Sequence, residues 1–351
     1  GRVVPGSQSF GEFYAGHSKD EPDVEIHGDD IWQMLFTSGT TSMPKCVMVS
    51  HTNTYMSAYS FALSITRGIS IENELKVCSF LPIMFHVADQ IFAYPVFLSG
   101  GTFVIGRTLN MPAMAEAITK EKITTLWSGS PAFLTGLTDL FLAEKDKYDA
   151  SSLKVIVYGW AQLSPDYHEK LKELCGRDLV AFEIFGQTES ISCYRFWPDK
   201  WPETYEKNAP EVNYVGVPNP LLASVIMDEN GSVINDPRVP GEAVYRSPAV
   251  MSGYYKDEEA TRKAFEHGWF HSGDSCMVDE NGLAIMVDRY KDIIKSGGEN
   301  VSSIRVEAVL RQHPAVEKVA VIALPHEKWG EMVTGVVVLK KDKHVLEAEL
   351  I

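Results

Sequence analysis

The sequence is short of cysteine and of positive charge, and it has no long apolar run. Its 351 residues include five cysteines that are scattered, odd in number and never in C-x-x-C spacing: Cys46, Cys78, Cys175, Cys193 and Cys276. This pattern argues against a zinc site or a disulfide framework, and a reducing cytoplasm is the simplest setting. No segment approaches the ~18 apolar residues of a membrane span, and the N-terminus lacks a signal-peptide layout. We therefore expect a soluble cytoplasmic protein.

The balance of charge is strongly acidic. Lys and Arg number 32 against 47 Asp and Glu, which gives a net charge of −15 at pH 7. Such a chain is not expected to bind nucleic acid or an anionic membrane surface as its default partner. The hydrophobic content of 45% is ample for a buried core, and the length exceeds that of a single growing core. Two or more domains are therefore expected.

One short polar segment stands out against this acidic background. It follows the apolar run 31–36 and reads Thr37-Ser38-Gly39-Thr40-Thr41-Ser42-Met43-Pro44-Lys45. Hydroxyl donors, a lysine, and a glycine that lets backbone N–H groups approach closely suit a polyphosphate ligand. The Walker pattern G-x-x-x-x-G-K-[ST] is not met, so a P-loop fold does not follow. The alternative is a solvated Ser/Thr-rich connection without a ligand.

Strand and helix patterns alternate through the first half of the chain. Strands are predicted at 76–80, 102–105, 124–127, 154–158 and 180–184, and helices at 52–65, 111–122, 131–143 and 165–175. This alternation favours an α/β fold with a mainly parallel sheet flanked by helices, which binds ligands in the loops after its strands. We expect the loop that begins at Thr37 to occupy such a place.

The second half of the chain changes character after residue 197. Prolines cluster there, and the turn signals at 229–231 and 279–282 predict two β-hairpins. This segment is predicted to be a β-rich subdomain of the large N-terminal domain.

A small α+β unit is predicted at the C-terminal end. A glycine turn at 296–300 precedes a helix at 303–312 and strands at 316–323 and 333–339. We place a domain boundary at Asp288/Arg289, which gives a large domain, 1–288, and a partial C-terminal domain, 289–351.

Two segments carry residues suited to nucleotide chemistry. Phe185-Gly186-Gln187-Thr188-Glu189 follows a predicted strand, so its aromatic ring could stack on a base and its carboxylate could hold Mg²⁺. A helix N-cap at Thr188 is the alternative. Asp274, in His271-Ser272-Gly273-Asp274, suits a ribose diol, and the alternative is an Asp that caps a β-turn.

His86 is a third candidate, at the end of Leu81-Pro82-Ile83-Met84-Phe85-His86. It could gate a site or simply satisfy a buried polar position, and a lone histidine is more often the latter.

The order and spacing of these segments resemble the adenylate-forming superfamily, which includes acyl-CoA synthetases, peptide-synthetase adenylation domains and luciferases. The resemblance covers residues 31–340. It rests on Thr37–Lys45, Leu81–His86, Phe185–Glu189, Gly241-Glu242 with Ser252-Gly253-Tyr254, Ser272–Asp274, and Asp288–Lys291 with Ser296–Glu307. The segments Gly297–Ser302 and Trp329-Gly330-Glu331 look most similar to acyl-CoA ligases of the fatty-acid or crotonobetaine/carnitine type.

The resemblance implies an ATP-dependent, Mg²⁺-assisted ligation of a carboxylic acid to CoA through acyl-AMP. It implies that Lys45 and the loop before it contact the phosphates and that Glu189 holds Mg²⁺. It further implies the following roles: Thr188 contacts the AMP phosphate, Phe185 stacks near adenine, Gly159 and Gly186 line the nucleotide site, Asp274 and Arg289 hold the ribose, His86 and Trp160 border the substrate pocket, and Asp288 is the hinge between two domain orientations. The family leaves a monomer or a homodimer open.

The chain also departs from the family pattern. Ser42 and Cys46 stand where the family usually has glycines, so the phosphate loop is expected to be somewhat less flexible than the norm. Trp160 stands where the family commonly has a small residue or glycine, so the acyl pocket is expected to be shortened or reshaped. The family's C-terminal Gly-Lys loop has no counterpart, and only 36 residues precede the phosphate loop. A truncated and poorly active chain is therefore expected, and two alternatives stay open: an adenylation domain that loads a carrier protein, and a non-catalytic nucleotide- or acyl-binding protein.

Overall fold

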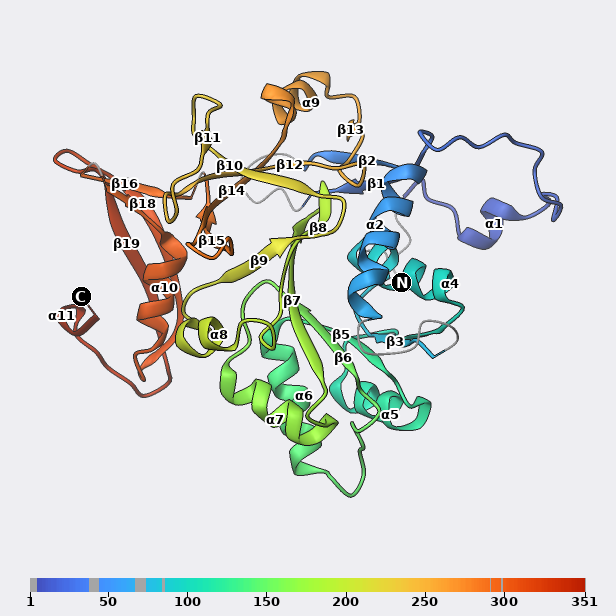
Figure 1. The fold of residues 1–351 in the computed structure, drawn as a ribbon, viewed down its shortest axis with the longest axis horizontal. Coiled ribbons are helices and arrows are strands. Elements are labelled where there is room, and N and C mark those ends of the chain that lie inside the picture. The colour runs from blue at the N-terminus through green and yellow to red at the C-terminus, as the bar shows by residue number, and fades with distance from the viewer. Residues whose placement is uncertain are drawn as a thin grey trace.

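The computed structural model describes residues 5–37, 44–66, 74–83, 86–290, 292–297 and 299–350. At its centre is a twelve-stranded sheet in the order β11-β10-β12-β14-β15-β9-β8-β7-β6-β5-β3-β4 (Figure 1). The strands from β7 to β4 pair in parallel, and the others pair antiparallel. The predicted α/β fold is confirmed, with the β-rich part built onto the same sheet.

The parallel half alternates strands and helices as the sequence predicts. The strands are β3 (Lys76–Ser79), β4 (Thr102–Ile105), β5 (Thr125–Gly129), β6 (Val155–Gly159) and β7 (Val180–Gln187). The helices are α2 (His51–Ile65), α3 (His86–Ala88), the π-helical η1 (Asp89–Ala93), α4 (Tyr94–Ser99), α5 (Met111–Glu121), α6 (Pro131–Ala143) and α7 (Pro165–Cys175). Helices α6 and α7 begin and end at the predicted residues.

Helices cover both faces of the parallel strands, which explains why these strands are continuous apolar runs. Side chains on a strand alternate between faces. In β6, Ile156 and Tyr158 pack toward α5, α6 and α7, whereas Val155 and Val157 pack toward α2, η1 and α4. Two buried cores therefore hold this half of the sheet.

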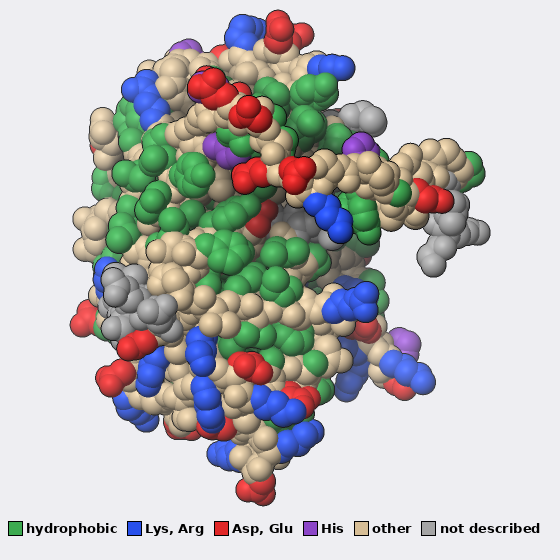
Figure 2. All heavy atoms as spheres, turned by 90° about the vertical axis from the view of Figure 1, so that its right-hand side faces the viewer, with side chains coloured by type: hydrophobic (Ala, Val, Ile, Leu, Met, Phe, Trp, Pro, Cys, Tyr) green, Lys and Arg blue, Asp and Glu red, His purple; other side chains and the backbone are tan. Residues whose placement is uncertain are grey.

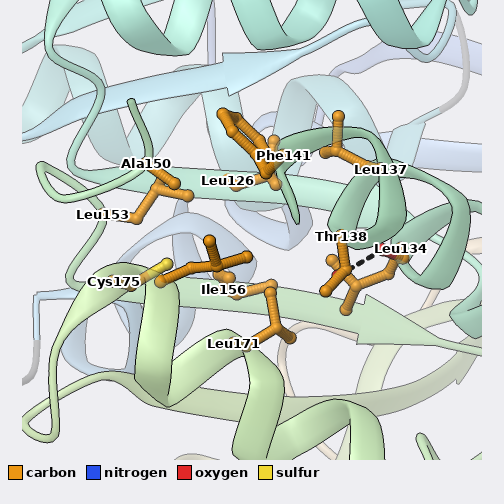
Figure 3. A pocket seen from close by; sticks show the side chains of 11 residues that line it. Leu126, Leu134, Leu137, Thr138, Phe141, Ala150, Leu153, Ile156, Leu171 and Cys175 are labelled. Atoms are coloured by element: carbon orange, nitrogen blue, oxygen red, sulfur yellow. Dashed lines mark hydrogen bonds between the residues drawn. The ribbon is translucent and has the colours of Figure 1, made fainter. Parts of the chain in front are cut away.

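The first of these cores contains a narrow gap between α6, α7 and the strands β5 and β6 (Figure 3). The side chains around it are almost all apolar, and the Thr138 hydroxyl donates to the Leu134 carbonyl within its own helix (2.7 Å). Because no polar group of the gap's described lining is left facing it, the gap is packing space rather than a ligand site.

The antiparallel half forms the predicted β-rich part. Its strands are β8 (Ser190–Phe196), β9 (Tyr214–Pro218), β10 (Ala223–Met227), β11 (Val233–Ile234), β12 (Gly241–Arg246), β14 (Phe270–Val278) and β15 (Ala284–Arg289). Both predicted hairpins are confirmed, since β10 pairs with β11 and β14 with β15. The short helices α8 (Pro202–Asn208), α9 (Glu258–Ala264) and η2 (Glu266–Gly268) lie between these strands in sequence.

The polar loop after residue 36 lies in a different place from the one predicted. It joins β1 (Ile31–Phe36) to β2 (Cys46–Ser50), which form an antiparallel hairpin with β13 (Gly253–Tyr254) at the other edge of β2. It therefore does not follow a strand of the large parallel sheet. Local periodicity identifies β1 as a strand, but it carries no information on which partner the strand takes.

The C-terminal part is a small four-stranded sheet with one helix packed on it (Figure 1). Its elements are β16 (Ile294–Ser296), β17 (Glu299–Val301), α10 (Ser303–Arg311), β18 (Val316–His326), β19 (Gly330–Leu339) and α11 (Glu347–Leu350). The helix and both long strands were predicted from the sequence. The domain boundary at Asp288/Arg289 falls within β15 and stays a prediction.

One face of the molecule exposes many apolar side chains (Figure 2). The exposed residues of β1, α2 and α4 include Met34, Phe36, Tyr55, Tyr59, Leu63, Phe97 and Leu98. The small helix α1 (Phe10–Tyr14) lies on the same side (Figure 1). In the described part of the chain, no helix is both long and apolar enough to cross a membrane.

Candidate active site

Seven of the predicted site residues line one open cleft of about 1330 Å³. The cleft is bordered by the two described ends of the β1–β2 loop, the end of β6, the β7–β8 turn, β14 and the end of β15. From the predicted set, its lining includes Thr37, Lys45, Trp160, Gly186, Thr188, Glu189 and Arg289. Segments more than 200 residues apart in the sequence, such as Lys45 and Arg289, are thereby brought together.

Thr188 and Glu189 form the tight turn of the hairpin between β7 and β8. Gln187 pairs with Ser190 across the turn, so the helix N-cap considered for Thr188 is wrong. Gly186 is required just before it, because a Cβ there would lie 2.2 Å from the Ile191 carbonyl oxygen. The turn therefore presents a hydroxyl and a carboxylate at the cleft on a rigid hairpin.

Phe185 precedes this turn on β7 and is partly buried. Its ring lies 6.3 Å from the ring of Tyr194 on the neighbouring strand. The described lining of the cleft includes neither Phe185 nor Gly159. The stacking of Phe185 on adenine and the nucleotide contact of Gly159 both stay predictions.

Glu189 is held by contacts from a distant segment. The Tyr254 hydroxyl donates to its Oε1 at 2.8 Å, and the Met251 N–H donates to its backbone carbonyl at 2.8 Å. Lys45 Nζ lies 4.6 Å above the centre of the Tyr254 ring. Tyr254 and Met251 were not singled out as site residues, and the Ser252-Gly253-Tyr254 motif was the only signal of them.

Asp274 and Arg289 lie opposite each other on β14 and β15 and form an ion pair, with Arg289 Nη1 2.7 Å from Asp274 Oδ1. Burial raises the pKa of the Asp274 carboxyl to about 7, although the Arg289 guanidinium opposes this shift. Asp274 lies inside a strand, so the interpretation as a turn cap is wrong. Arg289 lines the cleft, whereas Asp274 is buried beside it and is outside the described lining, so its contact with the ribose stays a prediction.

A second carboxylate organises the loop beside this pair. Glu242 Oε2 lies 2.8 Å from His271 Nδ1, and its Oε1 accepts a hydrogen bond from the Gly273 N–H at 2.8 Å. The amide of Gln187 lies between the carboxylates of this region. In one orientation it donates to Asp274 Oδ2 (3.3 Å), and in the other to the Ser272 carbonyl (3.2 Å) and Glu189 Oε2 (3.3 Å).

Trp160 follows β6 and borders the cleft. Its backbone has an unusual conformation. Its φ is +71°, its side chain is 65% exposed, and its ring lies 5.8 Å from the buried Trp127 ring. It also lies over Gly129, where a Cβ would meet the indole at 3.4 Å. The side chain thus fills space between the ends of β5 and β6.

Asp288 lies at the end of β15 and is almost fully buried. Its Oδ2 accepts hydrogen bonds from the Ser303 N–H (2.7 Å) and the Ser302 and Ser303 hydroxyls (3.2 and 2.9 Å) at the start of α10. The predicted hinge residue is therefore the contact that ties the C-terminal helix to the large sheet.

Some predicted residues cannot be placed. Ser38, Gly39, Thr40 and Thr41 lie outside the described residues, and His86 begins α3 without a described side chain. For the loop, only its ends are defined: the Thr37 N–H donates to the Lys45 carbonyl at 2.9 Å, and the Lys45 N–H donates to Thr37 Oγ1 at 3.1 Å.

The chemistry of the cleft fits a magnesium–nucleotide complex better than a metal held by protein alone. In the described residues no three His, Cys, Asp or Glu side chains converge as a metal cage. Mg²⁺ usually takes one or two carboxylates and completes its shell with substrate phosphates and water. Glu189 is a carboxylate in the cleft lining, and its role as a magnesium ligand stays a prediction.

Comparison with known proteins identifies the family. Residues 4–255 match the AMP-binding enzyme profile, and residues 305–351 match the AMP-binding enzyme C-terminal domain. The chain belongs to the AMP-binding enzyme family. The resemblance to the adenylate-forming superfamily is thus confirmed for both parts of this AMP-binding enzyme.

Curated relatives of this AMP-binding enzyme are CoA ligases. It is 31% identical over 350 residues to 4-hydroxybutyrate–CoA ligase 2 of Metallosphaera sedula, which covers 98% of this chain and 61% of the relative. It is 35% identical over 330 residues to the peroxisomal butyrate–CoA ligase AAE11 of Arabidopsis thaliana, covering 92% of this chain and 55% of the relative. The chain therefore spans little more than half the length of these relatives.

Solved structures agree with the fold. The ATP-bound MatB of Rhodopseudomonas palustris has a TM-score of 0.79 and 25% identity, covering 97% of this chain and 64% of the other. The O-succinylbenzoate CoA synthetase of Bacillus subtilis, solved with ATP and magnesium, has a TM-score of 0.79 and 26% identity, covering 94% and 65%. The fold described above is therefore that of the structural neighbours.

Proposed function

We propose that the chain forms the ATP- and acid-binding part of an AMP-forming carboxylic acid–CoA ligase. The observation that carries this proposal is the convergence of Lys45, Glu189 and Arg289 on one cleft, where Arg289 is paired with the buried Asp274. Family membership and the names of the relatives support the same activity, with ATP, Mg²⁺ and CoA as its cofactors and substrates.

The proposed reaction has two steps. A carboxylate oxygen of the acid attacks the α-phosphorus of ATP, the bond to the β-phosphate oxygen breaks, and pyrophosphate leaves with the bonding electron pair. The sulfur of CoA then attacks the acyl carbon, AMP leaves, and the thiol proton is released. Both steps move charge between phosphates and carboxylates, so positioned cations and donors supply most of the help the protein gives.

The predicted site residues divide this work. Lys45 and the donors of its loop neutralise the phosphates, and the hydroxyl of Thr188 contacts the phosphate that stays with adenosine. Arg289 and Asp274 bind the ribose hydroxyls, and Phe185, Gly159 and Gly186 border the base and sugar. Glu189 would hold Mg²⁺, which neutralises phosphate charge when bound. Asp288 serves as the hinge between the two steps, and His86 gates the acid pocket.

Trp160 is proposed to limit the acid pocket. The indole of Trp160 lies over Gly129 and next to the Trp127 ring, at the end of the parallel strands. A bulky side chain there leaves less room for a long acyl chain, which favours a small acid over a fatty acid. The fatty-acid or crotonobetaine/carnitine type suggested by the sequence stays a prediction, as do a cytoplasmic location and a homodimer.

The test is pyrophosphate release by the full-length gene product on a panel of carboxylic acids. Lys45→Ala and Glu189→Ala should each lower acid-dependent release about 100-fold or more, because each removes a charge aimed at the reacting phosphates. Lys318→Ala and Glu203→Ala are matched controls, since both residues are exposed and lie outside the described cleft lining. Unchanged turnover in both cleft variants, with an unchanged unfolding midpoint, would refute the assignment.

A further inference from the structure

We propose that Tyr254 is a positioning residue of this site. Its hydroxyl orients the Glu189 carboxylate for a divalent cation, and its ring keeps Lys45 and Glu189 from pairing with each other. The inference rests on the proposed function, because it assumes that Glu189 holds the metal of a metal–nucleotide complex.

Tyr254 is placed by backbone pairing between distant segments. It lies on β13, whose residues Gly253 and Tyr254 pair with Met48 and Val47 of β2. The next residue, Tyr255, donates its N–H to the Cys46 carbonyl at 2.8 Å. The strand that begins just after Lys45 therefore holds the tyrosine in register beside the lysine.

The tyrosine is also fixed in place by its surroundings. Tyr254 is only 7% exposed, and its backbone N–H donates to Thr261 Oγ1 at 2.9 Å. Its hydroxyl donates to Glu189 Oε1 at 2.8 Å. The side chain is therefore held from its backbone to its hydroxyl group.

This contact fixes one oxygen of Glu189 and leaves the other side of the carboxylate to the cleft. The Met251 N–H holds the Glu189 carbonyl, so the backbone of the turn is anchored from the same segment. Groups that hold a metal ligand in one orientation typically contribute about 10–100-fold to metal affinity or activity. Tyr254 occupies that place relative to Glu189.

The ring has a second effect through charge. Lys45 and Glu189 carry opposite charges, both line the cleft, and both contact Tyr254. Among the described residues, neither Lys45 nor Glu189 forms an ion pair, and both side chains contact Tyr254 instead. A direct pair would neutralise both side chains, whereas the ring face attracts the ammonium group and leaves its charge available to phosphate.

The experiment compares Tyr254→Phe with Tyr255→Phe in the full-length gene product. Tyr255 is a matched control, since it is 46% exposed, carries Lys256 Nζ 5.1 Å above its ring and makes no contact with Glu189. Mn²⁺ binding in the presence of ATP is followed by the loss of the free-ion electron paramagnetic resonance signal. The Mg²⁺ concentration for half-maximal pyrophosphate release is measured in parallel.

Tyr254→Phe should raise the Mn²⁺ concentration for half-saturation and the Mg²⁺ concentration for half-maximal pyrophosphate release about tenfold each. The kcat at saturating Mg²⁺ should change much less. Tyr255→Phe should change neither. Tyr254→Leu removes the ring as well, so Lys45 and Glu189 can pair, and excess Mg²⁺ should no longer restore kcat. The inference would be overturned if Tyr254→Phe and Tyr255→Phe gave the same half-saturating concentrations of Mn²⁺ and Mg²⁺.

A double-variant cycle separates this inference from the proposed function. If Tyr254 acts through Glu189, the Phe substitution should have no added effect on Mn²⁺ binding in a Glu189→Ala background. If Tyr254→Phe weakened Mn²⁺ binding as much in the Glu189→Ala background as in the wild type, the positioning role of Tyr254 would be overturned. If Glu189→Ala alone leaves Mn²⁺ binding unchanged, the metal role of Glu189 fails instead, and the inference falls with it.

Discussion

Trp160 has a backbone conformation that bulky side chains rarely adopt. Its φ of +71° lies in the left-handed region, which costs a residue with a Cβ about 1–2 kcal/mol relative to the right-handed form. The side chain is 65% exposed, so burial recovers little of that cost. Strain retained at a cleft is more easily explained by function than by folding.

We predict that Trp160→Gly widens acid selectivity with little loss of stability. Glycine removes the backbone strain, and the lost contact with Trp127 offsets this gain, so the free energy of unfolding should change by no more than about 1 kcal/mol. The kcat/KM for longer acids should rise relative to that for short ones. Trp269→Gly, at a position outside the cleft lining, serves as the control. An unchanged preference across an acyl-chain series would show that Trp160 does not limit the pocket.

Asp274 makes a pH-dependent contribution to stability. Its pKa is about 7 in the folded protein against an ordinary 3.8, because it is buried. The folded state therefore holds more protons than the unfolded state between these values, and the stability contributed by this group is complete below the lower value. It is lost as the pH rises through about 7.

Asp274→Asn should remove this dependence. The difference in unfolding free energy between wild type and variant should decline from pH 5 to pH 8, as measured by urea unfolding at each pH. Glu280→Gln is the matched control, because the Arg238 guanidinium lowers the pKa of Glu280 and its contribution should be constant over that range. A constant difference for Asp274→Asn would contradict the buried, high-pKa assignment.

At the scale of the element, helix α10 is capped from another part of the fold. Its own N-cap, Ser302, accepts from the Arg305 N–H at 3.2 Å, while Asp288 accepts from the Ser303 and Ile304 N–H groups at 2.7 and 3.3 Å. A negative charge at a helix N-terminus is favourable. The end of β15 and the start of α10 are thus joined through the side chain of Asp288.

We predict that Asp288→Ala weakens α10 by about 1 kcal/mol, the usual contribution of a lost cap. The amides of Ser303 and Ile304 should then exchange with solvent faster, which hydrogen exchange with mass spectrometry or NMR can follow. Asn110→Ala removes the cap of α5, where Asn110 accepts from the Ala113 N–H, and should accelerate exchange in α5 alone. Unchanged exchange in α10 would show that Asp288 does not hold it.

The same elements show how far the sequence predicts the fold. Helices α6 and α7 were predicted to the residue from apolar residues at three- and four-residue spacing, and each has a proline at its first position, which is also a local signal. The pairing of β2 with β13 joins residues about 200 positions apart, and no local pattern contains it. The cleft residues were found by motif, but the contact of Tyr254 with Glu189 depends on that distant pairing.

At the scale of the whole molecule, two surfaces of opposite chemistry coexist. The apolar face of β1, α2 and α4 contributes exposed aromatic and aliphatic side chains (Figure 2). The cleft instead has eight carboxylates against three Lys or Arg side chains in its described lining. The excess of negative charge in the cleft follows the acidity of the whole chain, and it opposes a ligand as anionic as ATP.

This charge predicts a strict requirement for a divalent cation in nucleotide binding. Free ATP should bind at least about tenfold more weakly in EDTA than in Mg²⁺, because carboxylates of the cleft repel uncompensated phosphates at short range. In EDTA, added NaCl should strengthen binding by screening this repulsion, whereas a basic phosphate site would lose affinity. Calorimetry on the full-length gene product measures both effects.

The charge argument can be tested on a single helix. Glu259 of α9 lines the cleft, whereas the neighbouring Glu258 is outside its described lining. Glu259→Gln should therefore tighten binding of free ATP in EDTA more than Glu258→Gln does, although both variants change the net charge of the protein equally. Equal effects of the two substitutions would mean that the overall charge of the protein, and not the charge of the cleft, acts on ATP. Equal affinity of the wild-type protein for ATP with and without Mg²⁺ would mean that the carboxylates of the cleft do not face the phosphates.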